Sequence, residues 1–196
     1  MTRRRTWLAA ELWLDLKIIL AYWNRPLNLR NIVWATFACD AFILLIMFRT
    51  RRWLRRHHIP LVNRVMRIME TALFAIELGN DVELGSGVVF MHTVGTVVGG
   101  DAKIGDECIF LGGNTIGANG GHGHPRIGAR TVIGAGARVL GEITIGEDCV
   151  LGANAVVVAD VPAGKVAVGI PARVSGDNKA LRTPYASAPQ PMTKPQ

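Results

Sequence analysis

The stretch Leu78–Pro162, which opens LGNDVELGSGVVF and closes VLGANAVVVADVP, repeats every six residues. Most sixes begin with an aliphatic residue followed by glycine: Leu78-Gly79, Leu84-Gly85, Val98-Gly99, Ile104-Gly105, Ile116-Gly117, Ile127-Gly128, Ile133-Gly134, Ile145-Gly146 and Leu151-Gly152. Others begin without that glycine: Phe90, Phe110, Val139 and Val157. The register slips twice, by two residues between Phe90 and Val98 and by five residues between Ile116 and Ile127.

A period of six residues that persists through thirteen units is typical of a parallel β-helix, in which each six forms one short strand and one corner. The first residue of each six points inward and stacks on its equivalent one coil away, which builds a continuous core. We expect the adjacent glycine to serve tight corners, because glycine adopts positive φ at low cost. Three sides of six residues make a coil of eighteen, so the repeat predicts a mainly β fold of a little over four coils.

Composition divides the chain into three parts. All 22 glycines lie at position 79 or later, whereas all five tryptophans lie at or before Trp53. Residues 1–76 carry a charge balance of +9 and residues 77–196 one of −2. We therefore predict a basic, apolar helical segment over 1–76, the β-helix domain over 77–175, and a disordered tail over 176–196, where proline is frequent and aliphatic content is low.

Hydrophobic periodicity predicts helices over 6–23, 29–49 and 60–75 in the first part. The apolar run 31–48 is near the lower length limit for a membrane span, and Asp40 interrupts it. We prefer a helix buried in an oligomer interface, with a span as the alternative. The basic run 49–58 is compatible with peripheral membrane contact. It carries no nucleic-acid reader motif, so we expect no nucleic-acid partner.

The three cysteines are far apart in sequence and lack metal-ligand spacing, which favours a reducing compartment such as the cytoplasm. Both interruptions of the repeat contain histidine. His92 lies in the first, and His122 and His124 lie in the second. Because loops and bulges re-aim side chains away from a regular scaffold, these histidines are candidate functional residues.

Four motifs give the chain a family resemblance: His92 followed by TVGTVVG, HPRIG at 124–128, IGAGARVLG at 133–141, and VAVGIPARV at 166–174. The chain resembles the serine acetyltransferases and their relatives among the hexapeptide acyltransferases. The resemblance implies a left-handed β-helix, a homotrimer with active sites between neighbouring rods, and acetyl transfer from acetyl-CoA to an acceptor hydroxyl, without a metal ion. A hydroxyl needs a base to become nucleophilic, and imidazole titrates near pH 6.5.

The resemblance also implies roles for individual residues. His92 matches the catalytic base, Glu77 takes the place of the family's aspartate that orients the base, and His124 matches a histidine that contacts the acceptor. The cofactor-binding set is assigned to the acetyl-CoA co-substrate. The backbone at Gly112 and Gly113 would approach the oxyanion, and the backbone at Ala135 and Ala153 would receive the pantetheine arm. The cations that would meet the CoA phosphates are Arg138, Lys165 and Arg173.

Three positions depart from the family pattern where it binds serine. Arg25 replaces the aspartate of a DPA motif, Met91 replaces an aspartate directly before the base, and Gly123 replaces the arginine directly before His124. The loop before His124 is also about three residues shorter. Losing all three charges suggests an acceptor that is not the serine zwitterion.

We therefore prefer a sugar hydroxyl, free or lipid-linked, in polysaccharide or exopolysaccharide biosynthesis at the inner face of a membrane. Three alternatives stay open. One is serine O-acetylation in cysteine biosynthesis. Another is a non-catalytic trimeric scaffold. The last is a zinc site built from His92, His122 and His124.

Overall fold

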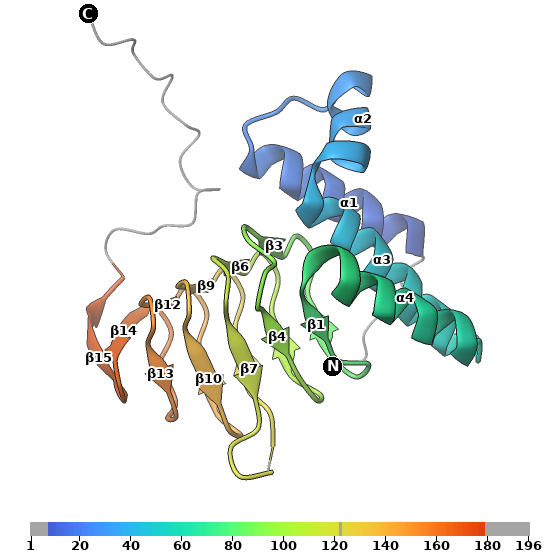
Figure 1. Ribbon diagram of the computed structural model, residues 1–196. Coiled ribbons are helices and arrows are strands. Elements are labelled where there is room, and N and C mark those ends of the chain that lie inside the picture. The colour runs from blue at the N-terminus through green and yellow to red at the C-terminus, as the bar shows by residue number, and fades with distance from the viewer. Residues whose placement is uncertain (1–7, 122, 179–196) are drawn as a thin grey trace, which may run out of the picture.

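The computed structural model describes residues 8–121 and 123–178, and it shows a three-sided rod with four helices at one end (Figure 1). Helices α1 (Leu8–Tyr22), α2 (Leu29–Ala38), α3 (Asp40–Arg56) and α4 (Pro60–Phe74) precede fifteen strands. The fold class predicted from the repeat, a parallel β-helix with N-terminal helices, is confirmed. Residues 1–7 and the predicted tail from 179 onward lie outside the described part. Strand β15 continues to Asp177, past the position where that tail was expected to begin.

Each side of the rod is one sheet. Sheet A contains β1 (Glu77–Leu78), β4 (Val97–Val98), β7 (Thr115–Gly117), β10 (Arg138–Leu140) and β13 (Val156–Val157). Sheet B contains β2 (Glu83–Leu84), β5 (Lys103–Ile104), β8 (Arg126–Ile127) and β11 (Thr144–Ile145). Sheet C contains β3 (Val89–Phe90), β6 (Ile109–Phe110), β9 (Val132–Ile133), β12 (Val150–Leu151), β14 (Lys165–Gly169) and β15 (Ala172–Asp177). The chain visits A, B and C in turn on every coil.

Strand register confirms both the coil length and the two slips. Val97 of β4 pairs with Thr115 of β7, eighteen residues later. Glu77 pairs with Val97 across twenty residues, because the first slip adds two. Lys103 pairs with Arg126 across twenty-three residues, because the second slip adds five. All pairings are parallel except β14 with β15, which is antiparallel. The interruptions therefore bulge from the corners and leave the ladder in register.

The repeat glycines that follow strands of sheet B are required for close packing of neighbouring coils, which corrects the expectation that they serve positive φ. The glycines at the second place of the sixes do not have positive φ. A Cβ atom on Gly85, Gly105 or Gly128 would instead lie 2.5 Å from backbone of the next coil. Left-handed backbone occurs two residues later in the six, at Gly87 and Glu107 for example. A side chain after a strand of sheet B would push coils apart, whereas Gly99 and Gly117, on sheet A, have room for a Cβ atom.

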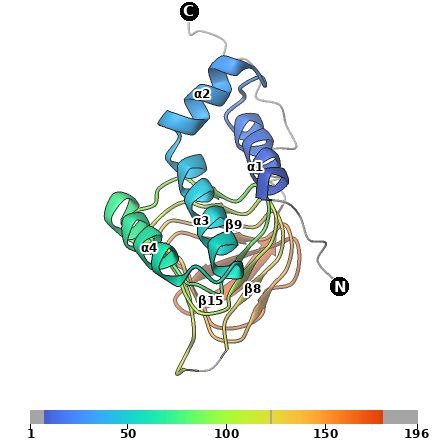
Figure 2. The ribbon, with the colours of Figure 1, turned by 90° about the vertical axis from the view of Figure 1, so that its right-hand side faces the viewer.

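The predicted helix over 29–49 is wrong, because the chain bends at Cys39 into two helices. Cys39 has extended backbone and separates α2 from α3 at an angle of 75°. The bend lets α2 pack against α1, while α3 crosses the end of the rod (Figure 2). Among the described helices, no single one is long and apolar enough to cross a membrane, and α2 and α3 meet that criterion only as a bent pair.

Helix α3 closes the open end of the rod with a buried arginine. The first coil has no coil before it, so its strand carbonyls lack ladder partners. Arg49 donates to the carbonyl oxygens of Leu84 and Gly85, at 2.8 and 2.5 Å, and forms a fully buried ion pair with Asp15 of α1 at 3.0 Å. Asp15 also accepts from the backbone N–H of Gly87 at 2.7 Å. These bonds fix α1 and α3 to the rod.

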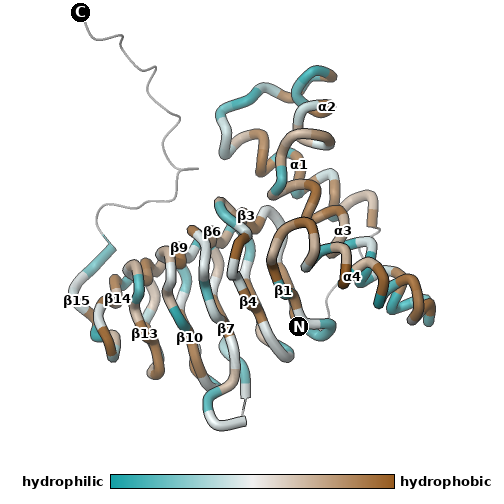
Figure 3. Tube along the Cα trace, viewed as in Figure 1, coloured by the Kyte–Doolittle hydropathy of each residue, from teal (hydrophilic) through white to brown (hydrophobic). Residues whose placement is uncertain are grey.

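A second buried arginine repeats this arrangement two residues later. Arg51 donates to the Leu78 carbonyl at 2.9 Å and pairs with Glu70 of α4 at 3.2 Å. The other Glu70 oxygen has no hydrogen-bond partner in the described part of the chain, and burial raises the pKa of this carboxyl despite the attraction of Arg51. Figure 3 shows how apolar residues continue from the rod into α1, α3 and α4.

Candidate active site

His92 lies at one edge of the rod, in the corner between β3 and β4 where the chain passes from sheet C to sheet A. We call this row of corners the His92 edge. The imidazole is exposed. Its Cβ lies so close to Gly112, in the same corner one coil on, that a side chain at Gly112 would meet it at 2.8 Å. Gly112 has φ +115°, a conformation suited to glycine. The two-residue interruption of the repeat therefore places the exposed His92 against the backbone of Gly112.

The other predicted co-substrate residues follow His92 along this edge. Gly113 occupies the corner after β6, Ala135 the corner after β9, and Ala153 the corner after β12, and both alanines are exposed. The N–H groups of Gly112 and Gly113 already donate, to Asn114 Oδ1 at 3.1 Å and to the Val94 carbonyl at 3.2 Å. A role as oxyanion donors would require those bonds to open, and it stays a prediction.

The three predicted phosphate-binding cations differ in position. Arg138 begins β10 on the His92 edge, where its guanidinium donates to Thr115 Oγ1 at 2.6 Å. Arg173 pairs in register with Val168, near the end of β14 that reaches this edge. Lys165 begins β14 at the opposite end of that strand, and its ammonium pairs with Asp177. The structure thus brings Arg138 and Arg173 to the edge but not Lys165.

Glu77 also lies at the His92 edge, because it begins β1, the first strand of sheet A. Its backbone pairs with Val97, which follows the His92 corner. Its side chain is exposed, while Leu78 beside it is buried. Within residues 8–121 and 123–178 no hydrogen bond or ion pair joins Glu77 to His92. The pair shares an edge, but its proposed contact stays a prediction.

His124 lies on a different edge, in the corner between β7 and β8 where the chain passes from sheet A to sheet B. Its Nδ1 lies 2.8 Å from Asp101 Oδ1. Its ring packs on Gly100, which has φ +58° and where a side chain would overlap the ring. Asp101 and Gly100 were not predicted from sequence. Sheet A separates this His124 edge from His92, so one chain does not bring the two histidines together.

The departures from the family pattern have structural reasons. Gly123 has φ +55°, and a Cβ there would lie 2.3 Å from Glu142 Cβ. An arginine at this position would require both the shortened loop and Glu142 to move. Met91 is half-buried, and its sulfur accepts a hydrogen bond from Tyr22 Oη of α1 at 3.1 Å. Tyr22 is a further site neighbour that sequence reasoning missed.

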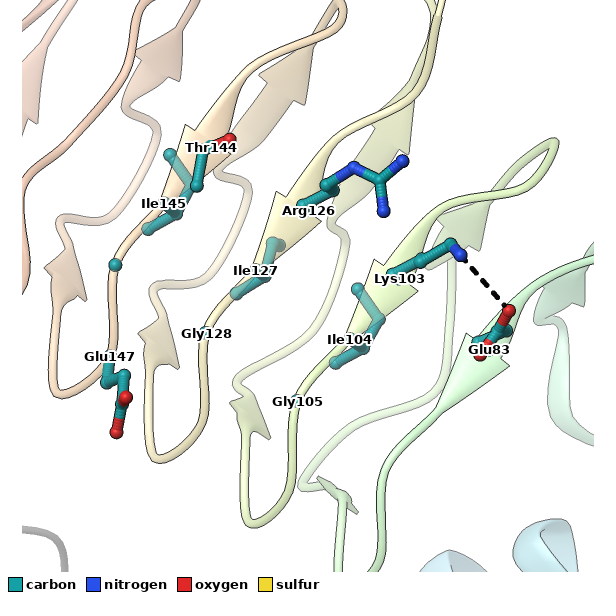
Figure 4. A pocket seen from close by; sticks show the side chains of 11 residues that line it. Glu83, Lys103, Ile104, Gly105, Arg126, Ile127, Gly128, Thr144, Ile145 and Glu147 are labelled. Atoms are coloured by element: carbon teal, nitrogen blue, oxygen red, sulfur yellow. Dashed lines mark ion pairs between the residues drawn. The ribbon is translucent and has the colours of Figure 1, made fainter. Parts of the chain in front are cut away.

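The outer face of sheet B carries a shallow groove of about 370 Å³ that contains neither His92 nor His124 (Figure 4). Lys103, Arg126 and Thr144 stand in a column along it, and Lys103 pairs with Glu83 at 3.3 Å. Among the described residues, no group of three His, Cys, Asp or Glu side chains could hold a metal ion. His122, required by the zinc alternative, lies outside the described residues.

Comparison with known proteins identifies the class. Residues 124–159 match the family model "Bacterial transferase hexapeptide (six repeats)". The chain is 36% identical over 163 residues to a serine acetyltransferase of Synechococcus elongatus, covering 82% of this chain but only 66% of that relative. It is 36% identical over 132 residues to a serine acetyltransferase of Helicobacter pylori, covering 66% of this chain and 77% of that protein. The fold and repeats define a hexapeptide-repeat transferase.

Solved structures agree with this class. The serine acetyltransferase of Brucella abortus in complex with coenzyme A superposes with a TM-score of 0.76 at 28% identity, over 86% of this chain and 68% of that one. The chain belongs to the serine acetyltransferase family, which confirms the resemblance drawn from the motifs. The comparisons give no support to a relationship with exopolysaccharide acetyltransferases.

Proposed function

We propose that the protein is an acetyl-CoA-dependent O-acetyltransferase in which His92 is the general base. The observation that carries the proposal is the row of exposed residues along the His92 edge, which includes His92, Ala135 and Ala153. The row occurs in a chain that belongs to the serine acetyltransferase family. A related structure binds coenzyme A, which supports acetyl-CoA as the donor. The corners that carry His92, Gly113, Ala135 and Ala153 follow one another along successive coils, and such a straight row suits the extended pantetheine arm.

The reaction follows from these positions. His92 takes the proton from the acceptor hydroxyl as the hydroxyl oxygen attacks the thioester carbonyl. The new C–O bond forms, the carbonyl oxygen becomes an oxyanion, and the C–S bond then breaks. The thiolate of CoA leaves and takes the proton back from His92. Glu77 would orient the imidazole and stabilise its cationic form.

A complete site requires a second copy of the chain, because His92 and His124 lie on opposite edges of sheet A. Rods packed side by side would place the His92 edge of one copy against the His124 edge of the next. Head-to-tail contacts of this kind close into a ring when the rotation from one copy to the next adds up to a full turn. We therefore keep the homotrimer as part of the proposal.

Serine is the acceptor that the relatives favour. Both curated relatives described above are serine acetyltransferases. The preference for a sugar acceptor, for polysaccharide biosynthesis and for a membrane location receives no such support. What still favours an acceptor other than serine is the replacement of three charges, at Arg25, Met91 and Gly123. The three free, buried cysteines suit a reducing, cytoplasmic location.

Thiol release from acetyl-CoA tests this function. Purified protein is incubated with acetyl-CoA and L-serine, free CoA is measured with a thiol reagent, and the product is identified by mass spectrometry. We expect serine-dependent CoA release that His92→Ala abolishes. Intact oligomers that release no CoA with serine or with a panel of sugars would instead favour the scaffold alternative.

A further inference from the structure

We propose that the acceptor subsite beside His92 binds a carboxylate through Arg25 and does not bind an ammonium group. The substrate class is then a small hydroxy acid, of which serine is one member and in which the amino group is dispensable. This inference rests on the proposed function and concerns the same site.

The contact between Tyr22 and Met91 places the end of α1 at the catalytic corner. Tyr22 is the last residue of α1, and Met91 directly precedes His92. The 3.1 Å hydrogen bond from Tyr22 Oη to Met91 Sδ therefore spans the space between the helical segment and the His92 edge. Arg25 lies in the turn that begins at this end of α1, three residues after Tyr22.

Arg25 is held rigidly in this segment. Its guanidinium carbon lies 3.9 Å from the centroid of the Trp34 ring, and its Nη1 donates to Asn31 Oδ1 at 3.3 Å. Its backbone N–H donates to the Leu20 carbonyl at 2.8 Å, which fixes the turn after α1. Trp23 packs edge-on against Trp34, with ring centroids 6.5 Å apart. An arginine stacked on an aromatic ring is pre-organised, so little entropy is lost when it binds an anion.

The charge of Arg25 is not paired with an acid of the described residues. Arg25 is exposed and forms no ion pair with any residue in the described ranges 8–121 and 123–178. Only one of its five N–H donors is used by a side-chain bond within that part of the chain. A guanidinium with free donors matches the two oxygens of a carboxylate.

The side chains that contact Arg25 and Met91 carry no negative charge to pair with an ammonium ion, and the acid of the same edge, Glu77, is assigned to the imidazole of His92. Met91 carries a thioether in the position next to the base, and its sulfur is already occupied by Tyr22. Asn31 and the tryptophans are neutral, and Asn31 is buried. An ammonium group in this subsite would lose water and face a cation, which is unfavourable. Carboxylate recognition without ammonium recognition follows.

Three acceptors that differ by one group test the proposal: L-serine, 3-hydroxypropanoate, which lacks the amino group, and ethanolamine, which lacks the carboxylate. Thiol release from acetyl-CoA and the mass of the ester product are followed for each. We expect kcat/KM for 3-hydroxypropanoate to lie within about threefold of that for L-serine. Ethanolamine should be about 10- to 100-fold poorer, the value of a hydrogen-bonded charge.

Arg25→Gln should lower kcat/KM for both carboxylate acceptors by about 10- to 100-fold, mainly through KM, and leave KM for acetyl-CoA unchanged. Arg30→Gln, at an exposed arginine on α2, is the matched control and should change neither. Circular dichroism of both variants checks that they fold. Arg25→Lys provides a second variant that keeps the charge but not the paired donors, and should recover only part of the loss.

Separate outcomes overturn the inference and the proposed function. If L-serine is used more than about tenfold better than 3-hydroxypropanoate, or Arg25→Gln behaves like Arg30→Gln, acetyl transfer stands and the Arg25 subsite is wrong. If none of the three acceptors yields an ester but a sugar does, acetyl transfer stands and the Arg25 subsite is wrong. If no acceptor yields an ester, sugars included, the proposed function fails and the subsite fails with it.

Discussion

Replacing Arg49 by methionine should weaken the contact between the helical segment and the rod and lower the free energy of unfolding. The substitution leaves Asp15 fully buried, and among the described residues the Gly87 N–H is then its one remaining donor. It also removes the arginine donor from the Leu84 and Gly85 carbonyls. Removing one partner of a buried pair costs about 3–5 kcal/mol. Losing the arginine's hydrogen bond to the buried Gly85 carbonyl, at about 1–3 kcal/mol, pushes the loss toward the upper end of that range.

Urea unfolding followed by circular dichroism measures this loss, at one fixed protein concentration because an oligomer's stability depends on it. With a slope of about 2 kcal/mol per molar urea, the midpoint should fall by about 2 M. Arg55→Met is the matched control, because its ion pair with Asp81 is exposed and contributes about 0–1 kcal/mol. A midpoint for Arg49→Met no lower than that of Arg55→Met would refute the reasoning about the rod end.

Three further predictions concern the base, a buried carboxylate and the thiols. His92→Ala should lower kcat by about 10²–10⁴ with unchanged circular dichroism, and undiminished transfer would exclude it as the base. Burial raises the pKa of Glu70, so the folded protein holds that proton more tightly than the unfolded chain. The stability of the wild type should therefore fall, relative to that of Glu70→Gln, as pH rises above the ordinary pKa of 4.5. A difference in urea midpoint between the two proteins that does not change with pH would contradict this. Burial raises the pKa of the Cys108 thiol to about 12 and also raises the pKa values of Cys39 and Cys149. A thiol reagent should therefore label these three buried cysteines slowly in the native protein and rapidly in the unfolded chain. Rapid labelling of the native protein would contradict this.

The repeat was sufficient to predict the rod, its coil length and the positions of both interruptions. A strict period fixes which residue stacks on which, so Val97 and Thr115 could be paired from sequence alone. It was not sufficient to explain the glycines, because the pattern shows their place but not which neighbour they approach. Only the stacked coils reveal that Gly85 faces backbone at 2.5 Å.

The helical segment was predicted less well. The apolar pattern runs through Cys39 without glycine or proline, so nothing local signals the bend. The bend depends on packing against α1 and the rod, which are distant in sequence. The Asp15–Arg49 pair joins residues 34 positions apart, and Tyr22 meets Met91 across 69 positions. Contacts between residues so far apart in sequence do not appear as a periodic pattern, so the sequence alone does not predict them.

The candidate site residues were predicted less completely than the rod and more completely than the helical segment. His92 was predicted because the period breaks there, whereas Ala135 and Ala153 were assigned from the family resemblance. Lys165 illustrates the limit of transferring a role by motif, since the strand places its ammonium beside Asp177. Asp101 lies in a regular corner, and its contact with His124 depends on the adjacent coil.

Mixing two inactive variants tests most directly whether catalysis occurs between copies at the His92 edge. His92→Ala and His124→Ala are each purified, shown to be inactive, unfolded together in equal amounts and refolded, and thiol release with the accepted hydroxyl compound is measured. If each site takes His92 from one copy and His124 from its neighbour, about a quarter of the sites regain both histidines and activity returns to about that fraction of wild type. If activity does not return while refolded wild type recovers fully, the two histidines do not act together across an interface.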